Sequence, residues 1–343
     1  MKSSTRFIII IISITCVAIA AFLYFNIFGA AVPLSIKDNY VYVPTGATFE
    51  QVVDSLKNKN IIKNERTFRL LAERMSYVKN PMRAGRFEVK PGWSMIRLVR
   101  HLRGGSQAPV KVVLTTERLV ENVAAKAARF IEPDSATIWG LLQNPDYLQE
   151  IGYNQDSLMS VFIPNTYEFY WNTTPQQFME RMLKEHDSFW SKNNRLAKAA
   201  AMGYTPNQIY TLASIVEKET NANSEKPRMA GVYLNRLRIG MRLQADPTAV
   251  FATRDFDTPR VTNYHIFFDS PYNTYLNAGL PPGPICMASI PSIDAVLNAE
   301  KNDYLYFVAT GENDGLHNFG ETLEQHNQNV RRYVETLKRR GLR

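Results

Sequence analysis

A long apolar segment near the N-terminus constrains this chain more than any other feature. From Phe7 to Phe28 almost every residue is apolar, and a helix of that length, rising about 1.5 Å per residue, crosses about 30 Å of hydrocarbon. Lys2 and Arg6 precede the segment without a neighbouring acid, so the positive-inside rule places residues 1–6 in the cytoplasm. The sequence therefore predicts a single-pass protein of the cell (inner) membrane, with a transmembrane helix over 7–28 and everything after it on the extracytoplasmic (periplasmic) side.

A cleaved signal peptide is the alternative, since Gly29, Ala30 and Ala31 are small residues at which a peptidase could cut. Signal peptides usually carry an apolar core of about 7–15 residues, which is shorter than the segment found here. The length of the segment therefore favours a retained anchor.

The composition excludes several classes of protein. The two cysteines, Cys16 and Cys286, cannot build a disulfide scaffold or a cysteine-ligated zinc site. The five histidines are scattered, and His317 and His326, which flank a polar segment, lack a third ligand, so we expect no metal and no cofactor. Lys and Arg number 40 against 32 Asp and Glu. The resulting net charge of +8 would suit any polyanionic surface.

Two stretches after the anchor repeat the same order of strand, glycine turn and helix. In each stretch the glycine is expected to supply an unusual backbone angle, and a Ser or Thr stands where the helix N-cap belongs. The corresponding residues are 40–43, Gly46 and Thr48 in the first stretch and 86–89, Gly92 and Ser94 in the second. The pattern resembles a LysM-like module, a small βααβ fold that binds glycan chains in other proteins, expected over 36–106. The sequence leaves open whether such a module binds sugar here or acts as a spacer.

The chain beyond the linker at 104–109 carries a helix with two carboxylates at its end. Thr205 is a natural N-cap and Pro206 suits the first turn, so the sequence predicts a helix from Pro206 onward. Its apolar stripe consists of Ile209, Leu212, Ala213, Ile215 and Val216. At about 100° per residue, Glu217 and Glu219 lie roughly 160° apart, so one pocket cannot be served equally by both. Glu219 falls nearer the centre of the stripe, which predicts a partly desolvated carboxyl with a raised pKa, as a general acid needs.

Several long motifs follow one another in order over about 205–335. They are Ala213–Thr220, Asn235–Thr248, Ser270–Tyr275, Gly279–Ile285, Tyr304–Ala309 and His326-Asn327. Together they resemble the MltG/YceG family of endolytic peptidoglycan transglycosylases. The anchor and the LysM-like segment fit the same family, so the resemblance covers nearly the whole chain. The sequence departs from the family's pattern at 263–268 and 286–291, where fine contacts with substrate would differ.

The resemblance implies a reaction that needs a single carboxyl. Glu219 aligns with the family's catalytic Glu, which protonates the oxygen that links N-acetylmuramic acid to N-acetylglucosamine. The carboxylate then takes a proton from the muramyl 6-hydroxyl, which closes on its own anomeric carbon and leaves a 1,6-anhydro end without consuming water. Because this nucleophile is intramolecular and already positioned, the second carboxylate of ordinary glycosidases is not required.

Other residues of these motifs are expected to shape a glycan groove. Leu280–Pro284 is a rigid loop with one flexible glycine, and the segment 272–275 offers aromatic faces and hydrogen-bond groups that suit acetamido sugars. The expected substrate contacts are Gln244, Asp246, Tyr272, Asn273, Thr274, Tyr275, Pro282 and Gly283. For each of them a role in the core or in a turn remains an alternative, and Asp246 before Pro247 is typical of a turn. We expect the run Tyr304–Ala309 to be a buried strand.

We therefore predict an α+β protein made of a transmembrane helix, a LysM-like α+β module and an α+β catalytic domain over 110–343 with its core at 205–335. Its partners would be peptidoglycan strands, the cytoplasmic membrane and peptidoglycan synthases, but not nucleic acid, and its cleavage would terminate the elongation of nascent strands. Two alternatives stay open. One is a non-catalytic glycan-binding scaffold of the wall-synthesis machinery, and the other is a hydrolytic muramidase that uses Glu217 or Asp246 as a second carboxylate.

Overall fold

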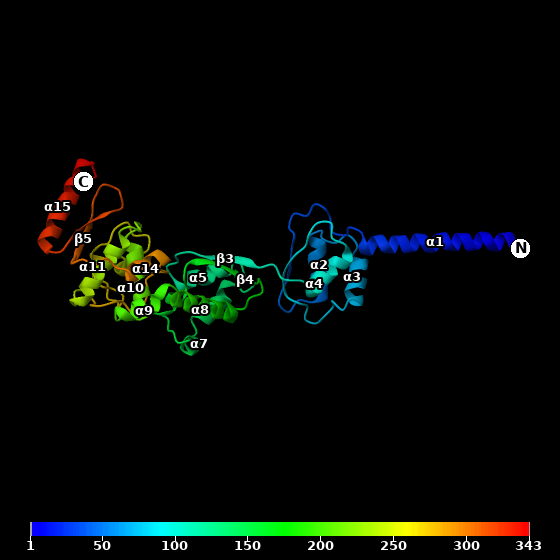
Figure 1. Cartoon of the computed structure of the whole chain (residues 1–343), viewed down its shortest axis with the longest axis horizontal. Helices are drawn as coiled ribbons and strands as arrows, with labels where there is room; N and C mark the ends of the chain where they lie inside the picture. The colour runs from blue at the N-terminus through cyan, green and yellow to red at the C-terminus, as the bar shows by residue number, and fades with distance from the viewer. Residues whose placement is uncertain (1, 343) are drawn as a thin grey trace. The chain divides into compact units, whose positions relative to one another are not determined.

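The computed structural model describes residues 2–342, which divide into two compact units (Figure 1). The first unit contains the chain up to Lys111 together with Phe130–Pro133 and Glu168–Thr174, and the second contains the remainder. Helices and small sheets occur in both units, so the α+β class is confirmed.

The first unit begins with the apolar helix α1 (Lys2–Phe28). Within residues 2–342, its segment Phe7–Phe28 is the one helix long and apolar enough to cross a membrane, and that segment is not buried in the protein. Both properties are consistent with the predicted single anchor, although a signal sequence would share them.

A βααβ arrangement follows the apolar helix. The elements of this region are β1 (Tyr40–Val43), α2 (Phe49–Asn58), α3 (Glu65–Arg74), β2 (Gly85–Glu88) and α4 (Met95–Gly104). Strands β1 and β2 pair antiparallel, with Tyr40 opposite Glu88. Their apolar residues share one core with the inner faces of α2 and α4. This order contains both predicted strand–turn–helix stretches, whereas the likeness to a LysM module stays a prediction.

Two glycines allow the turns that precede α2 and α4. Gly46 has a φ of 80° and Gly92 a φ of 77°, a left-handed conformation that costs glycine least. Thr48 caps α2 through a reciprocal capping box with Gln51, and Ser94 is the N-cap of α4 without a side-chain hydrogen bond. The predicted roles of the glycines and the positions of both N-caps are confirmed.

The second unit is mainly helical. Its helices are α5 (Val120–Ala127), α6 (Ser135–Leu142), α7 (Pro145–Glu150), α8 (Pro175–Ser191), α9 (Arg195–Ala201), α10 (Pro206–Glu219), α11 (Lys226–Arg238), α12 (Asp246–Thr253), α13 (Asn263–Ile266), α14 (Ile290–Leu297) and α15 (Leu323–Arg339), with short 3-10 helices over Leu158–Val161 and Lys192–Asn194. Its hairpin consists of β5 (Tyr306–Ala309) and β6 (His317–Gly320). Two further strands, β3 (Val110–Leu114) and β4 (Asn165–Phe169), pair with each other, and each has residues in both units.

Helix α10 is the central element of the second unit's core and packs against α9, α11, α12 and α14. Figure 1 labels α9, α11 and α14 near it. Its five predicted stripe residues are at most 1% exposed. Thr205 and Gln208 form a reciprocal capping box, and Pro206 occupies the first turn. The predicted helix, its start and its buried stripe are therefore confirmed. Because the core holds this helix on nearly every side, its C-terminal residues have defined positions.

The predicted strand at 304–309 exists, but its burial was wrongly predicted. The strand β5 begins at Tyr306 and is only half-buried. It belongs to a two-stranded antiparallel hairpin that packs against α15 (Figure 1). A run of six apolar residues indicates a strand covered on both faces, whereas a hairpin with one helix beside it leaves much of its surface open.

Candidate active site

Glu219 is the last residue of α10 and lines a cavity of about 650 Å³. The other walls of this cavity are the segment Thr220–Ala222, the loop that joins β5 to β6, and the C-terminal part of α15. A volume of this size lies in the range of ligand-binding pockets, which is about 300–1,000 Å³. The predicted acid therefore borders a space that can hold substrate.

The surroundings of Glu219 favour its protonated form. Burial raises the pKa of this carboxyl to about 7, and the negative charge of Asp246 acts in the same direction. Two groups on α11 oppose the rise, since the hydroxyl of Tyr233 donates a hydrogen bond to Oε1 of Glu219 and Arg236 contributes a positive charge. Burial prevails over both. The raised pKa predicted from the helical stripe is confirmed, and the carboxyl can both give and take a proton near neutral pH.

Glu217 lies in the opposite kind of environment. Its Oε2 accepts hydrogen bonds from the hydroxyls of Ser289 and Ser292, the second at 2.5 Å, and lies 3.1 Å from Nζ of Lys226. Burial alone would raise the pKa of Glu217, but these three donors outweigh it and the pKa is lowered. Glu217 is an ionised carboxylate that joins the end of α10 to the starts of α11 and α14.

A third acid, Glu225, lies directly before α11 and pairs with His317 at the start of β6. One oxygen of Glu225 accepts from the backbone N–H of His317 at 3.0 Å, and the other lies 3.0 Å from Nδ1 of the ring. His317 also lines the cavity of Glu219. In the sequence, His317 and His326 form a possible metal pair that lacks a third ligand. Within residues 2–342, no group of three or more His, Cys, Asp or Glu side chains could hold a metal ion.

Sequence reasoning missed the contributions of Tyr233 and Glu225. Tyr233 is fully buried and occurs among apolar residues of α11, so its position indicates core packing rather than a hydrogen bond to an acid. Glu225 precedes a helix and has the pattern of an ordinary helix start. Glu225 and His317 both lie between the motifs that the sequence analysis names, so no local signal joins them.

Two of the predicted substrate residues, Asp246 and Tyr275, interact electrostatically with Glu219, and Gln244 lies two residues before Asp246. None of the three lines the cavity of Glu219. Asp246 is exposed and opens α12, and the hydroxyl of Tyr275 donates to its Oδ1 at 2.5 Å. Asp246 acts on the pKa of Glu219 through its charge. The turn predicted at Asp246 is in fact the first turn of a helix, because Pro247 suits a first-turn position. Gln244 is exposed with a φ of 47°, a left-handed conformation that an amide residue tolerates better than most.

Asn273 and Thr274 are almost fully buried. The amide of Asn273 donates to the carbonyls of His265, Ile266 and Phe268 at 2.8–3.0 Å. Thr274 accepts from the backbone N–H of Ala245 at 3.0 Å and contacts the hydroxyl of Thr248 at 2.7 Å. Both side chains hold neighbouring backbone segments together, which favours the alternative of a structural role for each of them.

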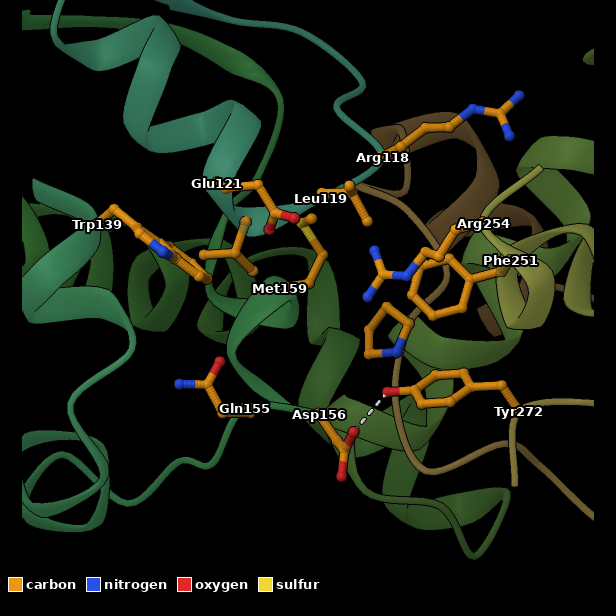
Figure 2. A pocket seen from close by; sticks show the side chains of 12 residues that line it. Arg118, Leu119, Glu121, Trp139, Gln155, Asp156, Met159, Phe251, Arg254 and Tyr272 are labelled. Carbon is orange, nitrogen blue, oxygen red and sulfur yellow. Dashed lines mark hydrogen bonds between the residues drawn. The ribbon is translucent and has the colours of Figure 1, made fainter. Parts of the chain in front are cut away.

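Tyr272 lines a separate cavity of about 290 Å³ in the second unit. Figure 2 shows its hydroxyl donating to Oδ1 of Asp156, at 2.8 Å, with Trp139 on the opposite wall and the guanidinium of Arg254 directed into the space. Arg254 stacks over the ring of Phe251 at 4.7 Å. An aromatic face and a hydrogen-bonding hydroxyl are present at Tyr272, but they lie in a different cavity from Glu219.

The proline loop approaches the same region through Gly283. A Cβ atom on this glycine would lie 1.8 Å from the backbone carbonyl oxygen of Asp156, so only glycine fits. Gly283 is buried, the neighbouring Pro282 is exposed, and Pro284 lines the cavity of Tyr272. The glycine was expected to make the loop flexible, but here it allows close packing.

Comparisons with known proteins give one consistent result. A model of the YceG-like family matches residues 41–332. The chain is 28% identical to an endolytic murein transglycosylase of Bacillus subtilis over 316 residues, which cover 86% of this chain and 85% of that protein. It is 26% identical to an endolytic murein transglycosylase of Streptococcus pneumoniae, of which it spans 58%. A crystal structure of a YceG-like protein from Listeria monocytogenes matches 84% of this chain and 97% of its own, with a TM-score of 0.57 and 28% identity.

Proposed function

Because this chain belongs to the YceG-like family, we propose that it is an endolytic murein transglycosylase with Glu219 as its single acid and base. The proposal rests on one observation above all, which is that Glu219 lines a cavity of substrate size and has a pKa raised to about 7. The relatives that carry this name match most of the chain.

The reaction follows from a carboxyl that can donate and then accept a proton. Protonated Glu219 donates to the glycosidic oxygen between N-acetylmuramic acid and N-acetylglucosamine, and the C–O bond breaks. The carboxylate then accepts the proton of the muramyl 6-hydroxyl as that oxygen bonds to the anomeric carbon. The proton count balances, the enzyme returns to its starting form and no water is consumed.

The state of the other carboxylates disfavours a hydrolytic muramidase. Glu217 accepts hydrogen bonds from Lys226 and two serines, so it is not free to activate a water molecule. Asp246 accepts a hydrogen bond from Tyr275 and lies at the start of a helix, where a carboxylate is stabilised by the helix dipole. We assign Asp246 the role of raising the pKa of Glu219 through its charge, and Gln244 and Tyr275 the role of sugar contacts near it. Tyr272, Pro282 and Gly283 would then border a more distant part of the strand.

We place the enzyme at the outer face of the cytoplasmic membrane. Helix α1 would anchor it with residues 1–6 in the cytoplasm and the second unit outside. There it would meet strands as synthases make them, and cleavage would end their elongation. The βααβ region would act as a LysM-like module next to the membrane.

The test is a digestion of purified glycan strands by the full chain, with the new ends identified by mass spectrometry. We expect 1,6-anhydro ends from the wild type and at least about 100-fold fewer from Glu219→Gln, because a general acid typically contributes a factor of that order or more. Glu217→Gln is the matched control, and we expect it to retain anhydro products.

Any other result of the digestion would contradict the proposal in a specific way. Reducing ends would show a hydrolase, and a complete absence of cleavage by the wild type would favour the non-catalytic scaffold. Full activity of Glu219→Gln would reject the assignment of the acid.

A further inference from the structure

The imidazole of His317 has one nitrogen in a fixed hydrogen bond and one that is open to the cavity. Nδ1 faces Oε2 of Glu225 at 3.0 Å. Within residues 2–342, Nε2 has no hydrogen-bond partner. It is also absent from the buried side-chain atoms without a partner, so Nε2 is exposed. Since His317 lines the cavity of Glu219, Nε2 is accessible from the space that a substrate would fill.

Glu225 determines which ring nitrogen carries the proton. A carboxylate oxygen only accepts hydrogen bonds, so the nitrogen that faces Glu225 is the protonated one. In the neutral ring Nε2 is then an acceptor. Glu225 is 7% exposed, and its second oxygen accepts from the backbone N–H of His317, so both oxygens are used and the pair is well defined.

The ring of His317 is also held in place relative to the acid. It packs edge-to-face on Phe307, with centroids 5.6 Å apart and an interplanar angle of 86°. Phe307 packs in the same way on Tyr233 at 5.9 Å and 80°, and Tyr233 donates to Glu219. Three rings therefore connect the open nitrogen to the carboxyl through rigid contacts.

We propose that His317 is a substrate-positioning residue, whose Nε2 accepts a hydrogen bond from a hydroxyl or acetamido N–H of the sugar that lies against Glu219. Glu225 acts through His317 by holding its tautomer. This inference rests on the proposed function, because it requires that a glycan fills the cavity. It assigns to the Glu225–His317 pair a task separate from proton transfer.

Three variants distinguish the contribution of Nε2 of His317 from that of Nδ1. His317→Asn keeps a donor near the position of Nδ1 and removes the group at Nε2. His317→Gln places an amide near the position of Nε2. Glu225→Gln keeps the shape of the acid, but its amide can donate to Nδ1, which moves the ring proton to Nε2 and turns the acceptor into a donor.

We expect kcat/KM on glycan strands to fall about 10-fold in His317→Asn and in Glu225→Gln, the loss typical of one hydrogen bond to substrate. His317→Gln should recover most of the activity, and the melting temperature of the full chain should stay close to that of the wild type in His317→Asn. His186→Asn is the control, because this histidine on α8 also contacts a carboxylate, Asp187 at 3.1 Å, outside the cavity.

The inference is overturned if His317→Asn keeps wild-type kcat/KM, or if His317→Gln is as impaired as His317→Asn. Its failure is distinguishable from failure of the proposed function. If the wild type does not cleave, binding of glycan strands to Glu219→Gln with and without His317→Asn still measures the contact. An affinity about 10-fold weaker in the double variant supports the proposal, and equal affinities reject it.

Discussion

The two sides of the end of α10 place the same chemical group in opposite surroundings. On one side Glu217 receives two hydroxyl donors and a lysine, and its pKa is lowered. On the other side Glu219 receives a single hydroxyl donor and borders a cavity, and its pKa is raised to about 7. The carboxyls are two residues apart on one helix, and burial raises the pKa of both. The balance between burial, nearby charges and hydrogen-bond donors determines whether such an acid is a structural anion or a proton carrier.

The difference also assigns a separate energetic cost to each side. Glu217 forms an ion pair with Lys226, so removal of the acid leaves the positive charge of Lys226 uncompensated. The Glu219 side retains an acid that the protein stabilises poorly when it is ionised. Instability of this kind is common where activity requires it. The comparison therefore predicts opposite changes in stability when each carboxylate is removed.

The largest expected effect is the destabilisation caused by Glu217→Ala. The side chain of Lys226 is 6% exposed, so the variant leaves a buried ammonium without its carboxylate. Removing one partner of such a pair costs about 3–5 kcal/mol. Calorimetry of the full chain at pH 7 should show the unfolding of the second unit at a markedly lower temperature.

The pH dependence of this effect has a definite sign. Because the folded pKa of Glu217 lies below its ordinary value of 4.5, its contribution is present above pH 4.5 and is lost as the pH falls through the folded pKa. Glu300→Ala is the control, since the pair of Glu300 with Arg228 is about 40% exposed and is expected to contribute less than about 1 kcal/mol. Equal melting temperatures of the two variants would contradict the description of the Glu217 side.

The second prediction is that Glu219→Gln stabilises the protein above neutral pH. The folded pKa of about 7 exceeds the ordinary 4.5, so the contribution of Glu219 is present below pH 4.5 and is lost as the pH rises through 7. At about 1.4 kcal/mol per pKa unit, the loss reaches about 3 kcal/mol. The uncharged amide avoids this loss.

Melting curves of wild type and Glu219→Gln between pH 4.5 and 8.5 test this prediction. The two proteins should melt at similar temperatures near pH 4.5, and the variant should gain stability as the pH rises. A difference that stays constant over this range would show that Glu219 is not a strained acid.

The site residues differ in how far local sequence could predict them. Thr205 and Pro206 start a helix for reasons contained in neighbouring residues, and the apolar period then determines which side of Glu219 is buried. The contact of Tyr233 with Glu219 joins two helices, and that of Glu225 with His317 joins a helix start to a strand 92 positions later. Such contacts depend on how the elements pack, which no local pattern encodes.

Residue type alone does not indicate whether a polar side chain faces a sugar or the core. Asn273 has the amide expected of a sugar contact, but its amide hydrogens are used by three backbone carbonyls. An unpaired buried carbonyl is costly, so this amide serves the end of α13 and the residues that follow it. Tyr272 and Tyr275 lie in different places for a similar reason. The hydroxyl of Tyr272 donates to Asp156, and that of Tyr275 donates to Asp246.

The smallest expected effect concerns the single donor on the Glu219 side. The hydroxyl of Tyr233 lowers the pKa of Glu219 by stabilising the carboxylate. Tyr233→Phe should therefore raise this pKa further and move the alkaline limb of the pH profile of kcat/KM to higher pH. It should cost about 1–2 kcal/mol of stability, the usual value of a lost hydrogen bond.

Tyr210→Phe is the matched control for the donor. Tyr210 is equally buried, and its hydroxyl donates to the carbonyl of Phe162 at 2.6 Å and accepts from Ala288 at 3.1 Å, away from Glu219. This variant should lose stability without any change in the pH profile. If Tyr233→Phe left the alkaline limb in place, or if Tyr210→Phe moved it equally, the hydrogen bond from Tyr233 would not be what lowers the pKa of Glu219. Burial and the charges of Asp246 and Arg236 would then account for its pKa.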